Sequence, residues 1–177
     1  MLDPNHQREL LNTGEFICPP TTSTSDEYSA TKTCERFIAF YFGVKLYCVK
    51  AQSVAEVVHS LTVAVLPNPP GVLAGIAALR GEVIVVLDLK DALKEEGGSS
   101  RDRSKMIVLR QQDGQTQFAI PIDQLHEVVM LPLEVLKPSG GLVQIVEYQE
   151  SVYNIIDLEK LSVEIELQLK DRGAING

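Results

Sequence analysis

Residues 36–93 read RFIAFYFGVKLYCVKAQSVAEVVHSLTVAVLPNPPGVLAGIAALRGEVIVVLDLKDAL, and this stretch decides the fold class. Short apolar runs alternate there with Gly, Pro and charged residues, and the runs are rich in β-branched and aromatic side chains. The same texture continues toward the C-terminus. The runs of strand length are FIAFYF (37–42), KLYCV (45–49), VLAGIA (72–77), VIVVLDL (83–89), KMIVL (105–109), QFAIPI (117–122) and VYNIIDL (152–158). So many short strands with few convincing helices predict an all-β protein built as barrels or a sandwich.

The chain also aligns with itself, which indicates an internal duplication. One set of positions recurs at a shift of 71 residues: Gly43, Tyr47, Val49, Glu56, Val57 and Val58 correspond to Gly114, Phe118, Ile120, Glu127, Val128 and Val129. A second set recurs at a shift of 69: Val83, Val86, Leu87, Asp88 and Leu89 correspond to Val152, Ile155, Ile156, Asp157 and Leu158. We therefore expect two homologous units of roughly 60 residues, which is small enough that the two should share a core.

The composition of the remaining segments sets the expected boundaries. Residues 1–34 contain Pro19-Pro20 and a Ser/Thr-rich run without hydrophobic period, which predicts a flexible N-terminal tail. A single domain is expected over 35–163: a first barrel at about 36–93, the polar linker KEEGGSSRDRSK at 94–105, and a second barrel at about 106–163. Residues 164–177 are expected to form a C-terminal tail.

The start of that tail is ambiguous. Val163, Ile165, Leu167 and Leu169 alternate like a strand, whereas Leu158, Leu161, Ile165 and Leu169 form a helical stripe. Asp157 before LEKL favours a capped helix, so a short C-terminal helix is predicted.

Charge and cysteine content exclude several classes of protein. The formal charge of −8 and the pI near 4.9 argue against nucleic-acid binding and against attraction to an anionic membrane. No apolar stretch is long enough for membrane insertion, and the N-terminus lacks the pattern of a secretory signal, so a cytoplasmic location is expected. The three cysteines, Cys18, Cys34 and Cys48, form no close pair, which predicts reduced thiols and no metal site.

No active site is recognisable, and no catalytic residue or cofactor is predicted. The segments GEV, GGSS and SGG lack the spacing of a phosphate-binding loop, and neither His59 nor His126 has a neighbouring nucleophile or ligand pair. Asp88 and Asp157 could serve as paired acids. Because they occupy the same corner of both repeats, however, a structural capping role is the better interpretation.

Residues 36–163 resemble the CheW-like domain of chemotaxis coupling proteins. The most specific elements are Val54-x-Glu56-Val57, Leu66-Pro67-Asn68-x-Pro70, Gly75, and Leu79-Arg80-Gly81 followed by Val83-Ile84-x-Val86-Leu87-Asp88-Leu89. The second repeat matches the C-terminal half of that domain. The resemblance implies two SH3-like five-stranded β-barrels packed on a shared core. It also implies a non-enzymatic scaffold that joins the cytoplasmic tip of a chemoreceptor to the regulatory domain of a CheA-type histidine kinase, recruited to receptor arrays at the inner membrane face.

The resemblance also implies two contact surfaces. The positions that match receptor-binding residues of the family are Val54, Glu56, Arg80 and Gly81. Val54 would lie at the base of an apolar groove, with the side chains of Glu56 and Arg80 at its edge. An ordinary intramolecular salt bridge between Arg80 and Glu56 is the competing interpretation.

The kinase-binding surface is expected at Val63, Val65 and Val83. Val63 and Val65 alternate along one strand, which would place them on one face. For any single valine among these, burial in the core remains the alternative.

Several departures from the family leave alternatives open. Ala78 stands where the family commonly has Asn, Val85-Val86 where it often has a Pro, and the N-terminal tail is long. One alternative function is therefore a CheW-like adaptor for a non-flagellar kinase pathway, such as pilus-based motility. Another is a small-molecule-binding module that uses the cleft between the barrels.

Overall fold

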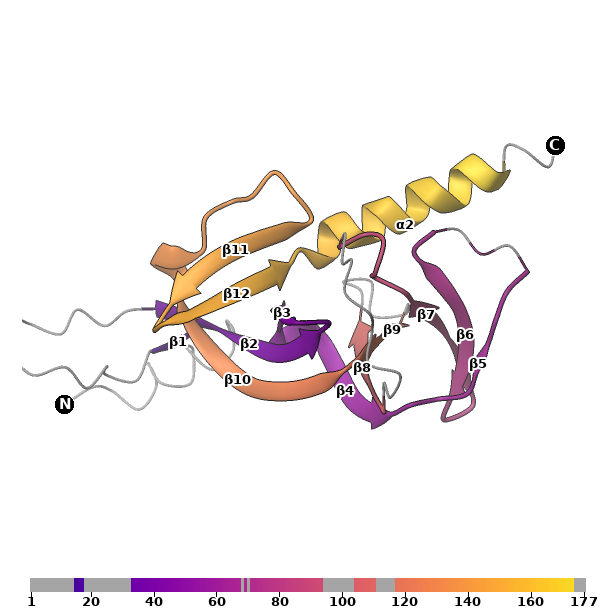
Figure 1. Ribbon diagram of the computed structural model, residues 1–177, viewed down its shortest axis with the longest axis horizontal. Helices are drawn as coiled ribbons and strands as arrows, with labels where there is room; N and C mark the ends of the chain where they lie inside the picture. Colours follow the sequence, from indigo (N-terminus) through magenta and orange to yellow (C-terminus); the bar gives the residue numbers. More distant parts are fainter. Residues whose placement is uncertain are drawn as a thin grey trace, which may run out of the picture.

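The structure is a computed structural model that describes residues 15–17, 33–67, 69, 71–93, 104–110 and 117–173. Its strands, short 3-10 helices and one α-helix follow one another along the chain as shown in Figure 1: β1 (Glu15–Ile17), β2 (Thr33–Phe42), β3 (Lys45–Lys50), η1 (Ala51–Ser53), β4 (Val54–His59), β5 (Val63–Ala64), β6 (Leu73–Leu79), β7 (Glu82–Leu87), β8 (Lys105–Arg110), β9 (Gln117–Ile122), β10 (Gln124–Pro132), η2 (Leu133–Val135), β11 (Val143–Tyr148), β12 (Ser151–Ile156) and α2 (Leu158–Gly173).

The strands form two six-stranded sheets, which confirms the all-β class and the pair of barrels. In sheet A the order is β1-β2-β3-β12-β11, with β10 on the other side of β2. In sheet B the order is β4-β8-β9-β7-β6-β5. The count exceeds the predicted five strands per barrel by one very short strand in each sheet, β1 in sheet A and β5 in sheet B.

The sheets exchange strands between the two halves of the chain, and this corrects the predicted barrel boundaries of 36–93 and 106–163. Sheet A takes β2 and β3 from the first repeat and β10–β12 from the second, whereas sheet B takes β4–β7 from the first and β8–β9 from the second. Two pairings link the halves in each sheet. In sheet A they are the antiparallel pair of β10 with β2 and the parallel pair of β12 with β3, and in sheet B the antiparallel pair of β4 with β8 and the parallel pair of β7 with β9. Periodicity in the sequence identifies strands but carries no information on which of two equivalent partners they choose.

The exchanged strands are buried on both faces. In β2, Phe37 and Ala39 point into a cluster inside sheet A, while Phe40 and Phe42 point into the main cluster. The alternation repeats in β8, where Met106 and Val108 face a cluster inside sheet B, and Ile107 and Leu109 face the main cluster. Since successive side chains of a strand point to opposite faces, each exchanged strand lies between a barrel's own core and a core that both barrels share.

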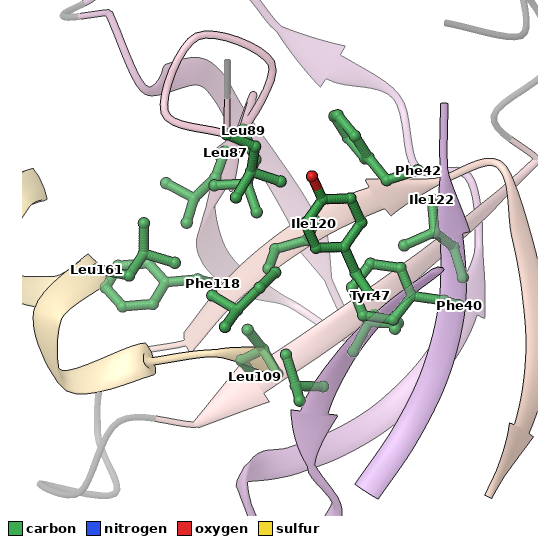
Figure 2. Packing of buried hydrophobic residues seen from close by; sticks show 14 of the residues in the cluster. Phe40, Phe42, Tyr47, Leu87, Leu89, Leu109, Phe118, Ile120, Ile122 and Leu161 are labelled. Carbon is green, nitrogen blue, oxygen red and sulfur yellow. The ribbon is translucent and has the colours of Figure 1, made fainter. Parts of the chain in front are cut away.

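The main cluster is the shared core that the small size of the repeats predicts. Figure 2 shows Phe40 and Tyr47 from sheet A together with Leu109 and Ile120 from sheet B, and Leu161 of α2 at the edge of the cluster. All five side chains are at most 2% exposed. Truncating one such core side chain to alanine typically costs about 2–5 kcal/mol, so the two barrels stabilise each other.

A half-buried carboxylate also joins the two halves of the chain. Asp123, between β9 and β10, accepts a hydrogen bond on Oδ2 from the backbone N of Gly43, at 2.6 Å. Its own backbone N donates to the carbonyl oxygen of Tyr41 at 3.0 Å. Gly43 has a φ of 63°, as the tight turn between β2 and β3 requires.

The tails are more ordered than the sequence predicts. Thr33 and Cys34 belong to β2, and Glu15–Ile17 pairs with that strand, so the predicted tail of 1–34 contributes to sheet A; its other residues lie outside the described ones. The predicted C-terminal helix is confirmed but runs through the expected tail of 164–177 to Gly173, because Leu161 and Ile165 bury their side chains in the shared core. The linker lies almost wholly outside the described residues.

The cysteines also differ from expectation. Cys48 is a free, buried thiol, and burial, together with the charge of Glu127, raises its pKa to about 12. Cys34 is disulfide-bonded, so the prediction of reduced thiols is wrong for this residue. The sequence separation of cysteines does not reveal which of them the fold brings together.

The strand exchange predicts that neither half of the chain folds alone. If the chain is divided within residues 94–103, each half should lack a cooperative thermal transition, because each sheet needs strands from both halves. Mixing the halves should restore the β-sheet circular dichroism spectrum and cooperative melting. A cooperative transition in either isolated half would contradict this topology.

Candidate functional site

Arg80 lies at the tip of a tight hairpin. Leu79 of β6 pairs with Glu82 of β7, which leaves Arg80 and Gly81 as a two-residue loop. Their φ angles are 52° and 87°, positive at both positions as in a type I′ turn. The left-handed region is costly for most residues other than Gly and Asn, so arginine is an unusual choice for this loop. The side chain of Arg80 is 76% exposed and is presented to solvent.

Glu56 of β4, a strand of the same sheet that does not pair with the β6–β7 hairpin, contacts Arg80. One Nη of Arg80 donates to Oε2 of Glu56 at 2.8 Å, and the Glu56 side chain is 26% exposed. Glu56 follows a bulge in β4, where the register against β8 shifts between Val54 and Glu56. Bulges of this kind redirect side chains, and here the strand presents the carboxylate beside the hairpin tip. The intramolecular ion pair that the sequence allowed is therefore present, although an exposed pair contributes only about 0–1 kcal/mol.

Val54 begins the same strand and pairs with Leu109 of β8. Its side chain is half-buried and packs against the main cluster. The structure thus brings Glu56, Arg80 and Gly81 together, and places Val54 two residues upstream on the strand that carries Glu56.

The second repeat contains the same hairpin without the arginine. Gln149 and Glu150 join β11 to β12 with φ angles of 48° and 63°, so both repeats have a left-handed two-residue loop. The shift of 69 residues places Gln149 opposite Arg80 and Glu150 opposite Gly81. The sequence analysis missed this correspondence, which the repeat alignment could have revealed. Since the turn forms without arginine, the turn itself does not explain Arg80.

The three valines expected at the kinase surface differ in exposure. Val83 pairs with Ala78 on the outer face of sheet B, and its side chain is 72% exposed. Val65 follows β5 and is 75% exposed. Val63 lies directly across from Ala77 and packs against the cluster inside sheet B, so it shares the inner face with the core. The expected common face of Val63 and Val65 is therefore not formed, because β5 ends at Ala64.

Gly75 holds β5 close to β6. A Cβ on this glycine would collide with the carbonyl oxygen of Ala64 and would lie 2.8 Å from Cγ1 of Val63. Only glycine permits this close approach of the two backbones. Gly75 therefore shapes the edge of sheet B that carries the exposed valine Val65.

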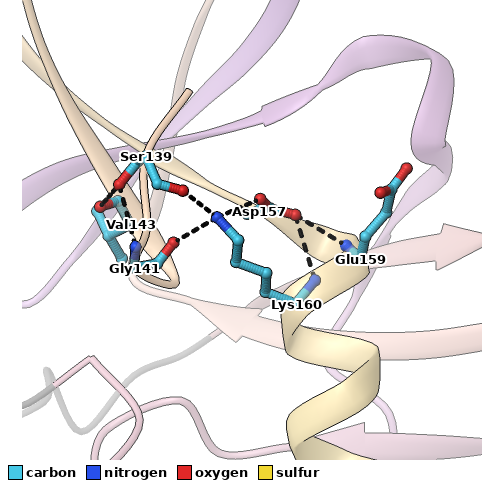
Figure 3. Close-up of polar contacts among 6 residues, drawn as sticks. All are labelled: Ser139, Gly141, Val143, Asp157, Glu159 and Lys160. Carbon is cyan, nitrogen blue, oxygen red and sulfur yellow. Dashed lines mark hydrogen bonds and ion pairs between the residues drawn. The ribbon is translucent and has the colours of Figure 1, made fainter. Parts of the chain in front are cut away.

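The two repeated aspartates have structural roles. The backbone N of Asp88 donates to the carbonyl oxygen of Val72 at 2.9 Å, and the backbone N of Asp157 donates to that of Leu142 at the same distance. Oδ1 of Asp88 accepts from the N of Lys90 at 3.0 Å. Oδ1 of Asp157 accepts from the backbone N of Glu159 and of Lys160 at 3.2 Å, which caps α2 (Figure 3).

We looked among the described residues for a metal-binding cluster and for a membrane-spanning helix. No cluster of three or more His, Cys, Asp or Glu side chains that could hold a metal occurs in the described part of the chain. None of the helices within the same ranges is long and apolar enough to cross a membrane.

Comparisons with known proteins identify several relatives. The family described as CheW-like domain matches residues 36–166. The chemotaxis protein CheW of Klebsiella aerogenes is 26% identical over 149 residues, which cover 79% of this chain and 89% of that protein. A probable chemotaxis protein CheW of Rhizobium etli is 25% identical over 112 residues, which cover 63% of this chain and 71% of that protein. Among solved structures, the scaffolding protein TtCheW from Thermoanaerobacter tengcongensis has the same fold, with a TM-score of 0.62, 24% identity and coverage of 70% of this chain and 89% of that one.

The geometry of the Arg80 turn predicts a contrast between two substitutions. Arg80→Asn should change the free energy of unfolding by less than about 1 kcal/mol, since Asn tolerates a positive φ and the lost ion pair is exposed. Arg80→Val should cost more than about 1 kcal/mol, because a β-branched side chain is strained there. Urea denaturation measures both, and equal costs would contradict a left-handed turn.

The cap of α2 predicts a pH-dependent contribution to stability. Burial alone would raise the pKa of Asp157, but its hydrogen bonds and ion pair with Lys160 outweigh burial, so the pKa lies below its usual value of 3.8. Asp157→Ala should cost about 1 kcal/mol at neutral pH, as lost helix caps do. Because the folded pKa is lowered, the ionic part of this difference is present above pH 3.8 and is lost as pH falls through the folded pKa.

Chemical denaturation at neutral pH and below about pH 3 measures that change. Asp157→Asn is the matched control, since it keeps an acceptor oxygen but has no charge to titrate. A difference between the aspartate and alanine proteins that is the same at both pH values would contradict the role of the carboxylate.

Proposed function

The chain belongs to the CheW-like family, and we propose that it couples the cytoplasmic tip of a chemoreceptor to the regulatory domain of a CheA-type histidine kinase. Membership of this family makes the chain a chemotaxis scaffold and not an enzyme. The observation that best supports the specific coupling is the arginine at the left-handed tip of the β6–β7 hairpin, where the equivalent hairpin of the second repeat has none.

The receptor would bind along the start of β4 and the Arg80 hairpin. Glu56 orients the guanidinium at 2.8 Å while most of the arginine side chain stays exposed and free to move to a partner. A guanidinium can fork onto carboxylates or onto the carbonyl groups at a helix end. Val54 would supply apolar contact at the half-buried base of this surface. A helical hairpin with an acidic or carbonyl-rich end fits such a surface.

The kinase would bind the outer face of sheet B around Val83 and Val65. Both side chains are more than 70% exposed, and Ala78 beside Val83 is exposed as well. Exposed apolar side chains can serve as the central contacts of a protein interface. Val63 would act indirectly, because it supports this face from the inner side of the sheet.

A cytoplasmic location, with recruitment to receptor arrays at the inner membrane face, is part of the same proposal. The output could be flagellar chemotaxis or another motility controlled by the same class of kinase, since the two described surfaces would serve either.

Charge reversal and apolar-to-acidic substitution test the two surfaces separately. Arg80→Glu should weaken receptor binding at least tenfold while leaving kinase binding unchanged, because the contact is charged and lies on the hairpin tip. Val83→Asp should weaken kinase binding by a similar factor and spare the receptor, because it places a charge in an apolar contact. Calorimetry against a purified kinase regulatory domain and a receptor cytoplasmic fragment measures both.

Matched controls come from the chain itself. Lys90→Glu makes the same charge change as Arg80→Glu on an exposed residue outside the hairpin. Val152→Asp makes the Val83 change at the equivalent position of the second repeat, where the side chain is 50% exposed. Loss of both partners with either surface variant, or equal losses with the controls, would refute the assignment of the two faces.

A further inference from the structure

A hollow of about 670 Å³ lies between the two sheets and the first turns of α2. Its floor includes Phe37 and Ile155 from sheet A, Leu109 and Phe118 from sheet B, and Leu161 from α2. Hollows of this size are typical of sites for small molecules in proteins. Because both sheets and the helix contribute, the hollow exists only in the assembled fold.

One wall of the hollow is held in place by Lys160. Its Nζ donates to the carbonyl oxygens of Ser139 and Gly141, the latter at 3.1 Å, and forms an ion pair with Asp157 at 3.0 Å (Figure 3). The backbone N of Gly141 donates in turn to the hydroxyl of Ser139 at 3.2 Å. An ammonium group has three donors, so Lys160 has none left for a ligand. The loop before β11 is thereby fastened to the start of α2.

Four cations and three carboxylates line the hollow, and most of them neutralise each other. Lys50 pairs with Glu35 at 2.9 Å, and Lys160 pairs with Asp157. Arg110 and Lys137 are exposed, and neither has an ion-pair partner among the described residues. Among the described lining residues the cations outnumber the carboxylates, and Arg110 and Lys137 are the cations outside these two ion pairs, so the hollow favours an anion.

The apolar part of the surface lies next to these cations in the chain. Leu136 and Pro138 flank Lys137 and line the hollow, and Leu158 lines it from the first turn of α2. Leu136 and Leu158 are only partly buried and can still lose surface to a ligand, at about 25 cal/mol per Å² of apolar area. A ligand with both a negative charge and an apolar body would use both features.

We propose that this hollow binds a small amphipathic carboxylate, with the carboxylate at Lys137 and Arg110 and an aliphatic chain or aromatic ring against Leu136, Pro138 and Leu158. The hollow adjoins the proposed receptor surface but shares none of its residues, since Val54, Glu56, Arg80 and Gly81 do not line it. Carboxylate binding is measured without receptor or kinase, so its failure is distinguishable from failure of the coupling function. Gln52 and Ser53 of η1 also line the hollow and directly precede Val54, so an occupant would lie next to the start of β4.

Titration of the full chain with octanoate and with 3-phenylpropionate, followed by NMR and calorimetry, tests the site. At least one of the two should bind and shift the backbone signals of Leu136, Lys137 and Leu158. The uncharged 3-phenylpropionamide should bind at least tenfold more weakly than its acid. The double variant Arg110→Gln, Lys137→Gln should weaken carboxylate binding at least tenfold, as expected when charge-assisted contacts are lost.

Two controls make the outcome decisive. Lys90→Gln removes one exposed cation that does not line the hollow and should leave binding unchanged. Equal melting temperatures of the double variant and the parent protein would show that the fold is intact. Failure of both carboxylates to bind, equal affinity for acid and amide, or binding that survives the double substitution would each overturn the proposal.

Discussion

The fold depends on strands that are buried on both faces. β2 and β8 each direct alternate side chains into the core of one barrel and into the core between the barrels. Removing either strand would open two cores at once, so the barrels cannot be stable as separate units of this size. The parallel pairings of β3 with β12 and of β7 with β9 complete this arrangement, because they join strands from opposite halves of the chain.

Features that occur in both repeats stabilise the fold, whereas positions at which the repeats differ are candidates for partner contacts. The aspartates Asp88 and Asp157 accept backbone hydrogen bonds in equivalent corners, and both long hairpins close with left-handed loops. These features serve the fold and therefore occur twice. Arg80 occurs once, on a loop that forms equally well in the second repeat. A partner can distinguish one barrel from the other only at positions where the two repeats differ, and Arg80 is such a position.

Sequence and structure agree to different degrees at the proposed surfaces. The Glu56–Arg80 contact could be anticipated, since both residues lie in short motifs whose strand positions are clear. The inward orientation of Val63 could not be anticipated, because it depends on the pairing of Val63 with Ala77 of β6 and on the end of β5 at Ala64. The sequence analysis allowed for a cleft between the barrels but could not predict its lining, which comes from six separate segments that meet only after the strands are exchanged.

By itself the sequence determined the all-β class, the two repeats, the capped C-terminal helix and the family, because strand-length runs, turn residues and a constant repeat shift are local or linear features. Only the tertiary structure decided which half supplies each strand. Equivalent strands such as β3 and β9 have the same pattern and could pair within either half. Their choice depends on the free energy of burying both faces in a shared core, and that energy is a property of the whole assembly.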